Sequence, residues 1–295
     1  MRARSPRLHR NRCGLVGCLV ASFLFGGCAL APVDGPAPLR YRDEVFTGVD
    51  VTRDIVYGGA VDQTGSDVTL RVDVYEPVDD TAATRPLIIF VHGGSFRSGS
   101  KASPEIVDQA NYFARRGYVV ASISYRLAPT GCTTVSAECV EAIIDAREDA
   151  QAAVRFFRRY ADDYGVDHDR IAIGGTSAGA ITAIGVAYGA DLPGSSGNPG
   201  HSAAVRGAQS ISGAAVFNGY IDGTDAPVLM FHGTADALVP WSWANSTLTT
   251  ARAAGLQAYL VTWAGDGHVP YVKHRAEILA LSTTFFYNVL DARNA

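Results

Sequence analysis

The chain has 295 residues, with 25 basic and 29 acidic side chains and a formal net charge of −4 at pH 7. The first 27 residues hold five arginines and no acidic residue, so a chain without them would carry a net charge of −9. A protein this acidic is not expected to bind nucleic acid or polyanionic substrates.

The first 27 residues have the pattern of an export signal. Their arginines precede a short apolar run, whereas a membrane-spanning helix needs about 20 apolar residues. The run ends in Leu24-Phe25-Gly26-Gly27-Cys28, which resembles a bacterial lipobox, and a second match at Cys18 follows too few apolar residues. We predict that residues 1–27 are a lipoprotein signal peptide, that Cys28 is lipidated, and that the protein is exported and anchored at the cell envelope. The alternative is a secreted protein cleaved near Ala29 or Ala31.

Residues 28–45 are rich in proline and polar side chains, which predicts a linker between the anchor and the folded part. The remainder, residues 46–295, has a size compatible with one α/β domain. Residues 53–57 and 68–75 alternate apolar and polar side chains, as half-exposed antiparallel strands do. Continuous apolar runs indicate strands that are buried on both faces.

Further strands and helices follow in alternation along this domain. Strands are predicted over residues 86–92, 118–124, 170–174, 206–216, 227–231 and 257–263, and helices over 104–116, 140–164, 180–185, 243–254 and 275–290. Such alternation predicts an α/β fold with a mostly parallel sheet and helices on both faces.

The segment Gly175-Thr176-Ser177-Ala178-Gly179 lies between a predicted strand and a predicted helix. The pattern G-x-S-x-G is that of a nucleophile elbow, in which a sharp turn holds the serine hydroxyl clear of the sheet. The glycines allow the strand and helix backbones to approach closely. Because glycine makes up 31 of the 295 residues, the pattern alone is weak and the rest of the chain must decide.

Two partners for Ser177 follow two later strands. Asp236 comes after the strand over 227–231, and His268 comes after the strand over 257–263. Both positions lie beyond the carboxyl ends of parallel strands, where ligands bind in open α/β sheets. Serine needs an imidazole to take its proton, and the imidazole needs a carboxylate to orient it. His232 and His274 are the rival bases, and Asp266 is the rival acid.

A glycine-rich turn after the strand over 86–92 supplies a fourth element. Its sequence is His92-Gly93-Gly94-Ser95-Phe96, and turns of this HGGG type donate a backbone N–H to the oxyanion of acyl transfer. We predict an oxyanion hole from the N–H of Gly94 or Ser95 together with that of Ala178.

Together these motifs resemble the α/β-hydrolase superfamily, and within it the bacterial esterase/lipase branch with feruloyl-esterase-like and hormone-sensitive-lipase-like carboxylesterases. The segments that carry the resemblance are 91–96, 124–129, 146–150, 175–179, 231–236 and 265–268. The resemblance implies hydrolysis of small-molecule carboxylic esters, short-chain or aryl, acetyl and feruloyl esters included, through an acyl-enzyme and without metal or organic cofactor.

Several residues depart from the commoner family patterns. Ser95, Thr176 and Ala180 stand where glycine, an acid and glycine are frequent, and the N-terminal region lacks the pattern of a helical cap. We therefore expect a small or absent cap, with the loops 129–138 and 191–201 as lid candidates. An exopeptidase or a lactonase on the same fold, and a catalytically silent binding lipoprotein, are the alternative functions.

The remaining predictions concern cysteines and aromatic residues. Cys132 and Cys139 are the cysteines that remain after processing apart from Cys28, and an exported protein meets an oxidising compartment, so a local disulfide is expected. No further sulfur or His pair suggests a metal site. The aromatic residues just beyond the predicted acid and base are candidates for a substrate pocket: Trp241, Trp243 and Tyr271.

Overall fold

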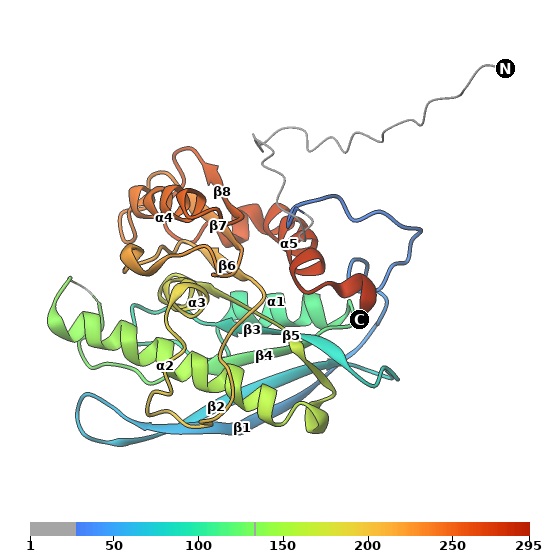
Figure 1. Cartoon of the computed structure of the whole chain (residues 1–295), viewed down its shortest axis with the longest axis horizontal. Helices are drawn as coiled ribbons and strands as arrows, with labels where there is room; N and C mark the ends of the chain where they lie inside the picture. The colour runs from blue at the N-terminus through green and yellow to red at the C-terminus, as the bar shows by residue number, and fades with distance from the viewer. Residues whose placement is uncertain (1–27, 133) are drawn as a thin grey trace.

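A twisted sheet of eight strands runs through the centre of the molecule (Figure 1). The computed structural model describes residues 28–132 and 134–295. The sheet has the order β1-β2-β4-β3-β5-β6-β7-β8, in which β2 pairs antiparallel with β1 and β4 and every other pairing is parallel. Its strands are β1 (Val49–Val61), β2 (Asp67–Pro77), β3 (Arg85–Val91), β4 (Val119–Ser124), β5 (Val166–Thr176), β6 (Ala208–Ile211), β7 (Val228–Gly233) and β8 (Ala258–Trp263).

Helices cover both faces of this sheet. One face packs against α1 and α5 through one apolar core, and the other face packs against α2, α3 and α4 through a second core. The longer helices are α1 (Pro104–Ala114), α2 (Ala137–Arg159), α3 (Ala178–Tyr188), α4 (Trp241–Ala253) and α5 (Tyr271–Val289), and short 3-10 turns are η1 (Asp162–Tyr164), η2 (Asn218–Tyr220) and η3 (Ala292–Asn294). This arrangement confirms the predicted fold class.

Burial explains the strand patterns in the sequence. All seven residues of β3 are buried, as expected for a central strand between helix layers, whereas β1 alternates because one of its faces meets solvent. β6 is shorter than the predicted strand over 206–216. It ends at Ile211 because Ser212 adopts a left-handed backbone conformation, with φ of 57°, which turns the chain away from the sheet.

The segment over residues 28–45 is a packed part of the domain and not the free linker that its composition suggests. Ala29 and Tyr41 are buried in the core under α1 and α5. The Ala29 N–H donates to Gln257 Oε1 over 2.6 Å, and Asn288 Nδ2 donates to the carbonyls of Ala29 and Ala31. The predicted linker was wrong because a few apolar residues anchor an otherwise polar stretch.

The two predicted lid loops differ in position. Ser196, in the loop 191–201, is buried and donates to Asp149 Oδ1 over 2.6 Å, which fixes this loop against α2 instead of over the carboxyl ends of the strands. The loop 129–138 lies at those ends and contains Cys132, whose disulfide to Cys139 ties it to the start of α2. The connection from β6 to β7 carries only η2 as regular structure.

The predicted signal peptide, residues 1–27, lies outside the described residues. Among the helices of the described part, none has the length and apolar character needed to cross a membrane.

Candidate active site

Ser177, His268 and Asp236 meet at the edge formed by the carboxyl ends of the parallel strands. Ser177 follows β5, Asp236 follows β7 and His268 follows β8, and these strands lie in one half of the sheet. The Ser177 hydroxyl donates to His268 Nε2 over 2.7 Å, and His268 Nδ1–H donates to Asp236 Oδ2 over 2.7 Å. Because the carboxylate accepts from Nδ1, the other ring nitrogen is left to accept the serine proton.

The serine is held in a strained turn. Its φ of 55° and ψ of −117° are rare for a residue with a side chain. Glycines make the turn possible, because a Cβ on Gly175 would lie 2.3 Å from the carbonyl oxygen of Gly179, and one on Gly179 would lie 2.0 Å from that of Val91. The backbone therefore fixes the hydroxyl at the top of the sheet before any ligand arrives.

Asp236 is a buried carboxylate surrounded by donors. It accepts the backbone N–H groups of Leu238 and Val239 at 2.9 and 3.0 Å in addition to His268. His232, whose Nε2 donates to the Val239 carbonyl over 2.8 Å, lies 3.2 Å from Asp236 Oδ2. Burial alone would raise the pKa of Asp236, but these hydrogen bonds outweigh it and hold that pKa well below its usual range. Asp236 is thus kept ionised beside His268.

The rival residues have other partners. His232 is fully buried against Asp236 and bonds the Val239 carbonyl, whereas the hydrogen bond to Ser177 comes from His268. His274 bonds Asp266 and stacks on Trp263, with 3.9 Å between the ring centroids. Asp266 also pairs with Lys273. This second cluster fixes the loop that carries His268, since the Asp266 carbonyl accepts the N–H of Ala235 over 2.9 Å.

The two predicted sources of oxyanion donors both lie at the cavity that contains the serine. Ser95 and Ala178 both line the cavity that contains Ser177, and Gly94 is not among its lining residues. Gly94 has φ of 117° and a Cβ there would lie 2.0 Å from the Ser98 carbonyl oxygen, so only glycine forms this turn. Ala178 is the first residue of α3, where the N–H groups have no acceptor within the helix. Of the two alternatives, Ser95 is the one that lines the cavity together with Ala178, and the donor role of its N–H stays a prediction.

The cavity above Ser177 has a volume of about 620 Å³ and mostly apolar walls. Its walls come from the glycine-rich turn, the disulfide loop, α2, α3, α4, the segment after β6 and the segment after β7. Side chains that reach into it are Phe96, Val135, Val140, Ile143, Ile181, Val216, Leu238, Val239 and Trp243. Within the described residues, no group of three or more His, Cys, Asp or Glu side chains is placed to hold a metal ion.

Two family models match the chain in succession. The model described as BD-FAE matches residues 72–217, and the model described as TAP-like protein matches residues 203–288. Among solved structures, Thermogutta terrifontis esterase 2 phosphorylated by paraoxon is 26% identical, with a TM-score of 0.69 over 85% of this chain and 97% of that one. The chain belongs to the α/β-hydrolase superfamily.

Curated relatives of this α/β-hydrolase also carry esterase names. A probable isoprenylcysteine alpha-carbonyl methylesterase of Arabidopsis thaliana is 35% identical over 44% of this chain and 23% of its own length. The para-nitrobenzyl esterase of Bacillus subtilis is 30% identical over 40% of this chain and 24% of its own length. The chain thus spans about a quarter of the length of these curated relatives.

The three aromatic candidates of this α/β-hydrolase have different positions. Trp243 lines the cavity and is partly exposed there. The other two predictions were wrong: Tyr271 is buried and donates to Asp108 Oδ2 over 2.6 Å, between α5 and α1, and Trp241 does not line the cavity. Each of the two begins a helix, and the direction of a side chain at a helix start depends on a helix phase that spacing alone does not give.

Sequence reasoning also missed functional neighbours. His232 was set aside as a base, yet it contacts the acid. Its position four residues before Asp236, directly after the predicted strand over 227–231, was the available signal. The apolar wall residues Ile181 and Leu238 had no sequence signal, because each is one apolar residue among many.

Proposed function

We propose that this α/β-hydrolase is a serine carboxylesterase. The observation that carries the proposal is the continuous chain of hydrogen bonds from Ser177 through His268 to Asp236, with Ser177 in the lining of an apolar cavity. The esterase names of its relatives and structural neighbours support the same reaction class.

The geometry assigns each of these residues a step in ester hydrolysis. Ser177 Oγ attacks the ester carbonyl carbon while His268 Nε2 takes its proton, and the N–H groups of Ser95 and Ala178 stabilise the oxyanion. The tetrahedral intermediate collapses, the C–O bond to the alcohol breaks, and His268 returns the proton to the leaving oxygen. Water then attacks the acyl-enzyme with His268 again as base, which releases the acid and restores the serine.

Covalent labelling tests this proposal. A fluorophosphonate probe should label Ser177, as located by peptide mass mapping, and His268→Ala should lose the label while remaining folded. Thermogutta terrifontis esterase 2 was itself solved phosphorylated by paraoxon. Hydrolysis of 4-nitrophenyl butyrate, lost in Ser177→Ala, would then assign the activity. A folded wild-type protein that takes no label would overturn the proposal, and amide cleavage in preference to ester cleavage would reassign it to a peptidase.

We also propose that the chain is exported and lipid-anchored through Cys28. The arginine-rich start, the apolar run and the lipobox-like ending support this, and the Cys132–Cys139 disulfide suits an oxidising compartment. Metabolic labelling with an alkynyl fatty acid in a bacterial host would test it. Label should disappear in Cys28→Ser and persist in Cys18→Ser, which serves as the matched control. Label that persists in Cys28→Ser would contradict the proposal.

A further inference from the structure

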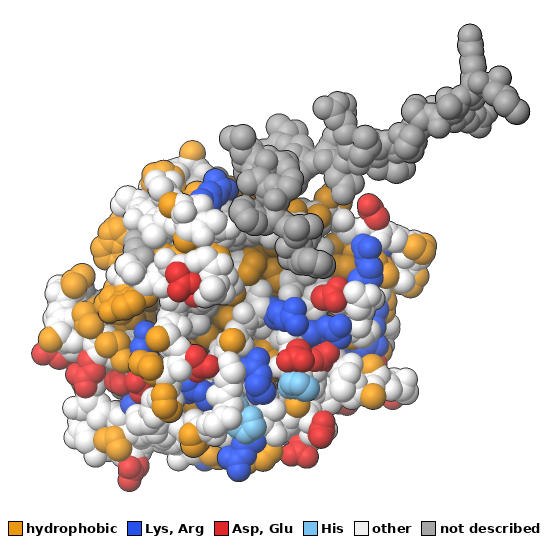
Figure 2. Space-filling view, in the orientation of Figure 1, with side chains coloured by type: hydrophobic (Ala, Val, Ile, Leu, Met, Phe, Trp, Pro, Cys, Tyr) orange, Lys and Arg blue, Asp and Glu red, His pale blue; other side chains and the backbone are white. Residues whose placement is uncertain are grey.

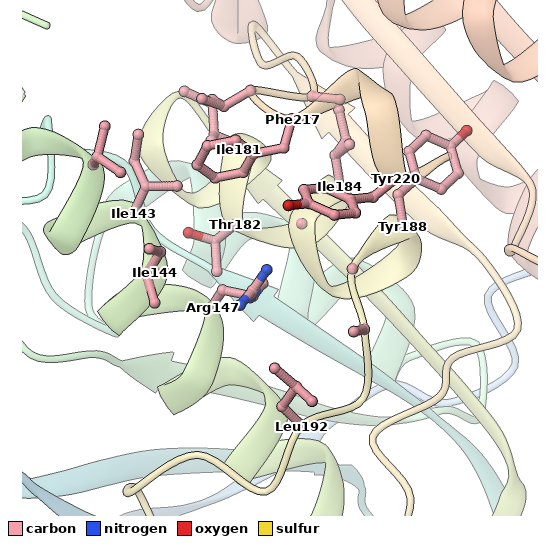
Figure 3. Close-up of a pocket in the computed structure, with 16 residues that line it drawn as sticks. Ile143, Ile144, Arg147, Ile181, Thr182, Ile184, Tyr188, Leu192, Phe217 and Tyr220 are labelled. Atoms are coloured by element: carbon pink, nitrogen blue, oxygen red, sulfur yellow. The ribbon is translucent and has the colours of Figure 1, made fainter. Parts of the chain in front are cut away.

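A second cavity of about 340 Å³ adjoins the catalytic one (Figure 3). It lies between α2, α3 and the segment that contains η2. Five residues line both cavities and so form a shared wall of small and aliphatic side chains: Val140, Ile143, Ile181, Ala215 and Val216. The second cavity therefore lies directly beside the space above Ser177, on the other side of this wall.

Hydrophobic side chains also surround the openings of the two cavities. The space-filling view shows them gathered between α2 and α4, beside α3 (Figure 2). Most of the exposed large apolar residues in the described chain line one cavity or the other. They are Val135, Leu192, Val216, Phe217, Tyr220, Leu238 and Trp243. Their concentration at the cavities indicates a surface that binds an apolar ligand.

Two polar groups interrupt the apolar wall at the far end of the second cavity. The Tyr188 side chain is only 4% exposed, and its hydroxyl has no hydrogen-bond partner among the described residues. Burial raises the pKa of Tyr188, so this hydroxyl remains protonated and available as a donor. In the close-up, the Tyr188 hydroxyl and the Arg147 guanidinium point into the same part of the cavity (Figure 3).

Among the described residues, Arg147 is the one charged residue in the lining of this cavity. Its buried Nε has no acceptor, and no ion pair or hydrogen bond involves its side chain within the described part of the chain. Its aliphatic stem lies against the glycine face of α3, with Cδ 3.5 Å from the position that a Cβ on Gly185 would take. The carboxyl end of α3 offsets part of its charge, but a carboxylate would match the guanidinium fully.

We propose that this second cavity binds the acyl part of an ester whose apolar chain ends in a carboxylate. This inference rests on the proposed esterase function and names its substrate class. The chain would extend from the acyl carbon at Ser177 past Ile181 along α3, and its terminal carboxylate would accept hydrogen bonds from Arg147 and Tyr188. Tyr188 lies eleven residues beyond Ser177, which is about 16 Å along the helix axis, so a butyryl group is too short to reach it.

Matched pairs of esters test this substrate class. For the series from adipate to dodecanedioate, each mono-4-nitrophenyl ester is compared with the 4-nitrophenyl ester of the monocarboxylic acid of equal length. The readout is the ratio of the two kcat/KM values on one preparation, so differences in folded fraction cancel. We expect the ratio to peak at one chain length in the wild type. In Arg147→Met it should fall about tenfold or more, and in Tyr188→Phe by less, because a charge-assisted hydrogen bond is the stronger one.

Arg159→Met provides the matched control, because Arg159 lies on the same helix but is exposed and outside both cavities. Its ratio should equal that of the wild type, and Arg147→Lys should restore part of the ratio. A ratio that is the same in the wild type and in Arg147→Met, or that has no maximum with chain length, would overturn the proposal. So would inhibition by dodecanedioate that is noncompetitive with 4-nitrophenyl butyrate, since that pattern indicates a separate effector site.

Failure of the esterase proposal would be visible separately. If the wild type does not cleave 4-nitrophenyl butyrate, the reaction class is wrong, and calorimetric titration of Ser177→Ala with dodecanedioate and with dodecanoate still tests the cavity. Tighter binding of the dicarboxylate, lost in Arg147→Met, would support the site, and equal binding of the two acids would overturn it.

Discussion

Two buried carboxylates in this molecule have similar hydrogen-bonding surroundings but different roles. Asp236 accepts two backbone N–H groups and lies between two imidazoles at the catalytic edge. Asp149 on α2 accepts the Arg126 backbone N–H and a forked pair of guanidinium bonds of 2.7 and 3.0 Å, along with the Ser196 hydroxyl. Each carboxylate thus accepts several hydrogen bonds. The partner of Asp149 is Arg126, which keeps its proton. The partner of Asp236 is His268, which can exchange a proton with Ser177.

The difference shows what turns a buried ion pair into a catalytic group. The Arg126–Asp149 pair joins α2 to the loop 191–201, and Arg126 also donates to the Val61 carbonyl at the end of β1. Arginine stays charged at any pH that a protein tolerates, so this cluster can only hold elements together. At the catalytic edge the partner is an imidazole whose second nitrogen accepts a hydrogen bond from Ser177, so the carboxylate there orients a group that can move a proton.

Asp236→Asn should give the largest effect and defines the catalytic side of the comparison. Loss of the carboxylate removes the group that orients His268, and kcat should fall by about 10⁴-fold. Steady-state kinetics with 4-nitrophenyl butyrate measure this, with Asp50→Asn on the exposed face of β1 as the matched control. A loss below tenfold in a folded protein would remove Asp236 from the catalytic group.

Asp149→Asn should act on stability instead. It leaves the buried Arg126 guanidinium without its principal counter-charge, which typically costs about 3–5 kcal/mol in the free energy of unfolding. Asp145 at 3.2 Å from Arg126 offsets part of this loss. Urea unfolding measures the change, and kcat of the folded fraction should remain that of the wild type. If kcat instead falls as far as in Asp236→Asn, the two clusters are not functionally distinct.

A similar contrast exists between two imidazoles, because His92 is fully buried after β3 while His268 is hydrogen-bonded to the nucleophile Ser177. Burial lowers the pKa of His92 from 6.5 to about 4, and its Nε2 has no partner among the described residues. Between these two pH values the His92 ring is therefore protonated in the unfolded chain and neutral in the folded one. Folding stability should fall by about 3 kcal/mol as the pH drops through this window.

His92→Phe should remove that slope and retain the ring that stacks on Tyr125. Urea unfolding of the wild type and the variant from pH 4 to pH 7.5 gives the comparison. Because other groups titrate equally in both proteins, the difference between the two curves isolates His92. Parallel curves would show that His92 is not buried as a neutral ring.

The disulfide should give the smallest effect. The bond between Cys132 and Cys139 closes a short loop at the wall of the catalytic cavity, with a sequence separation of 7. The chain-entropy model gives about 2.5 kcal/mol of stability for such a loop. The double variant Cys132→Ser/Cys139→Ser should lose this amount in urea unfolding, and reduced wild type should match it. Equal stability of oxidised and reduced protein would contradict the prediction.

The sequence was informative where chain direction alone determines position. Parallel strands bring their carboxyl ends to one edge, so residues that follow β5, β7 and β8 had to converge, and Ser177, Asp236 and His268 do. The sharp turn at Ser177 was readable because its glycines have no substitute at such close backbone contacts.

The sequence was uninformative where a side chain's direction depends on tertiary packing. Tyr271 and Trp243 each lie close after a catalytic residue, yet one packs against α1 and the other lines the cavity. Arg147 has the sequence pattern of an ordinary helix surface residue, and only the structure shows that it lies beside α3 with no counter-charge among the described residues. The segment 28–45 was misread because composition measures average polarity and two buried side chains are enough to anchor a stretch.

The packed N-terminal segment fixes which way the molecule faces when it is held by that end. Cys28 lies 3.2 Å from the Tyr259 hydroxyl, at the amino end of β8, whereas His268 follows the carboxyl end of the same strand. A strand of six residues separates the two ends by about 20 Å. A bead, a vesicle or an envelope membrane coupled at residue 28 would therefore adjoin the amino edge of the sheet and leave the catalytic opening turned toward the surrounding solution.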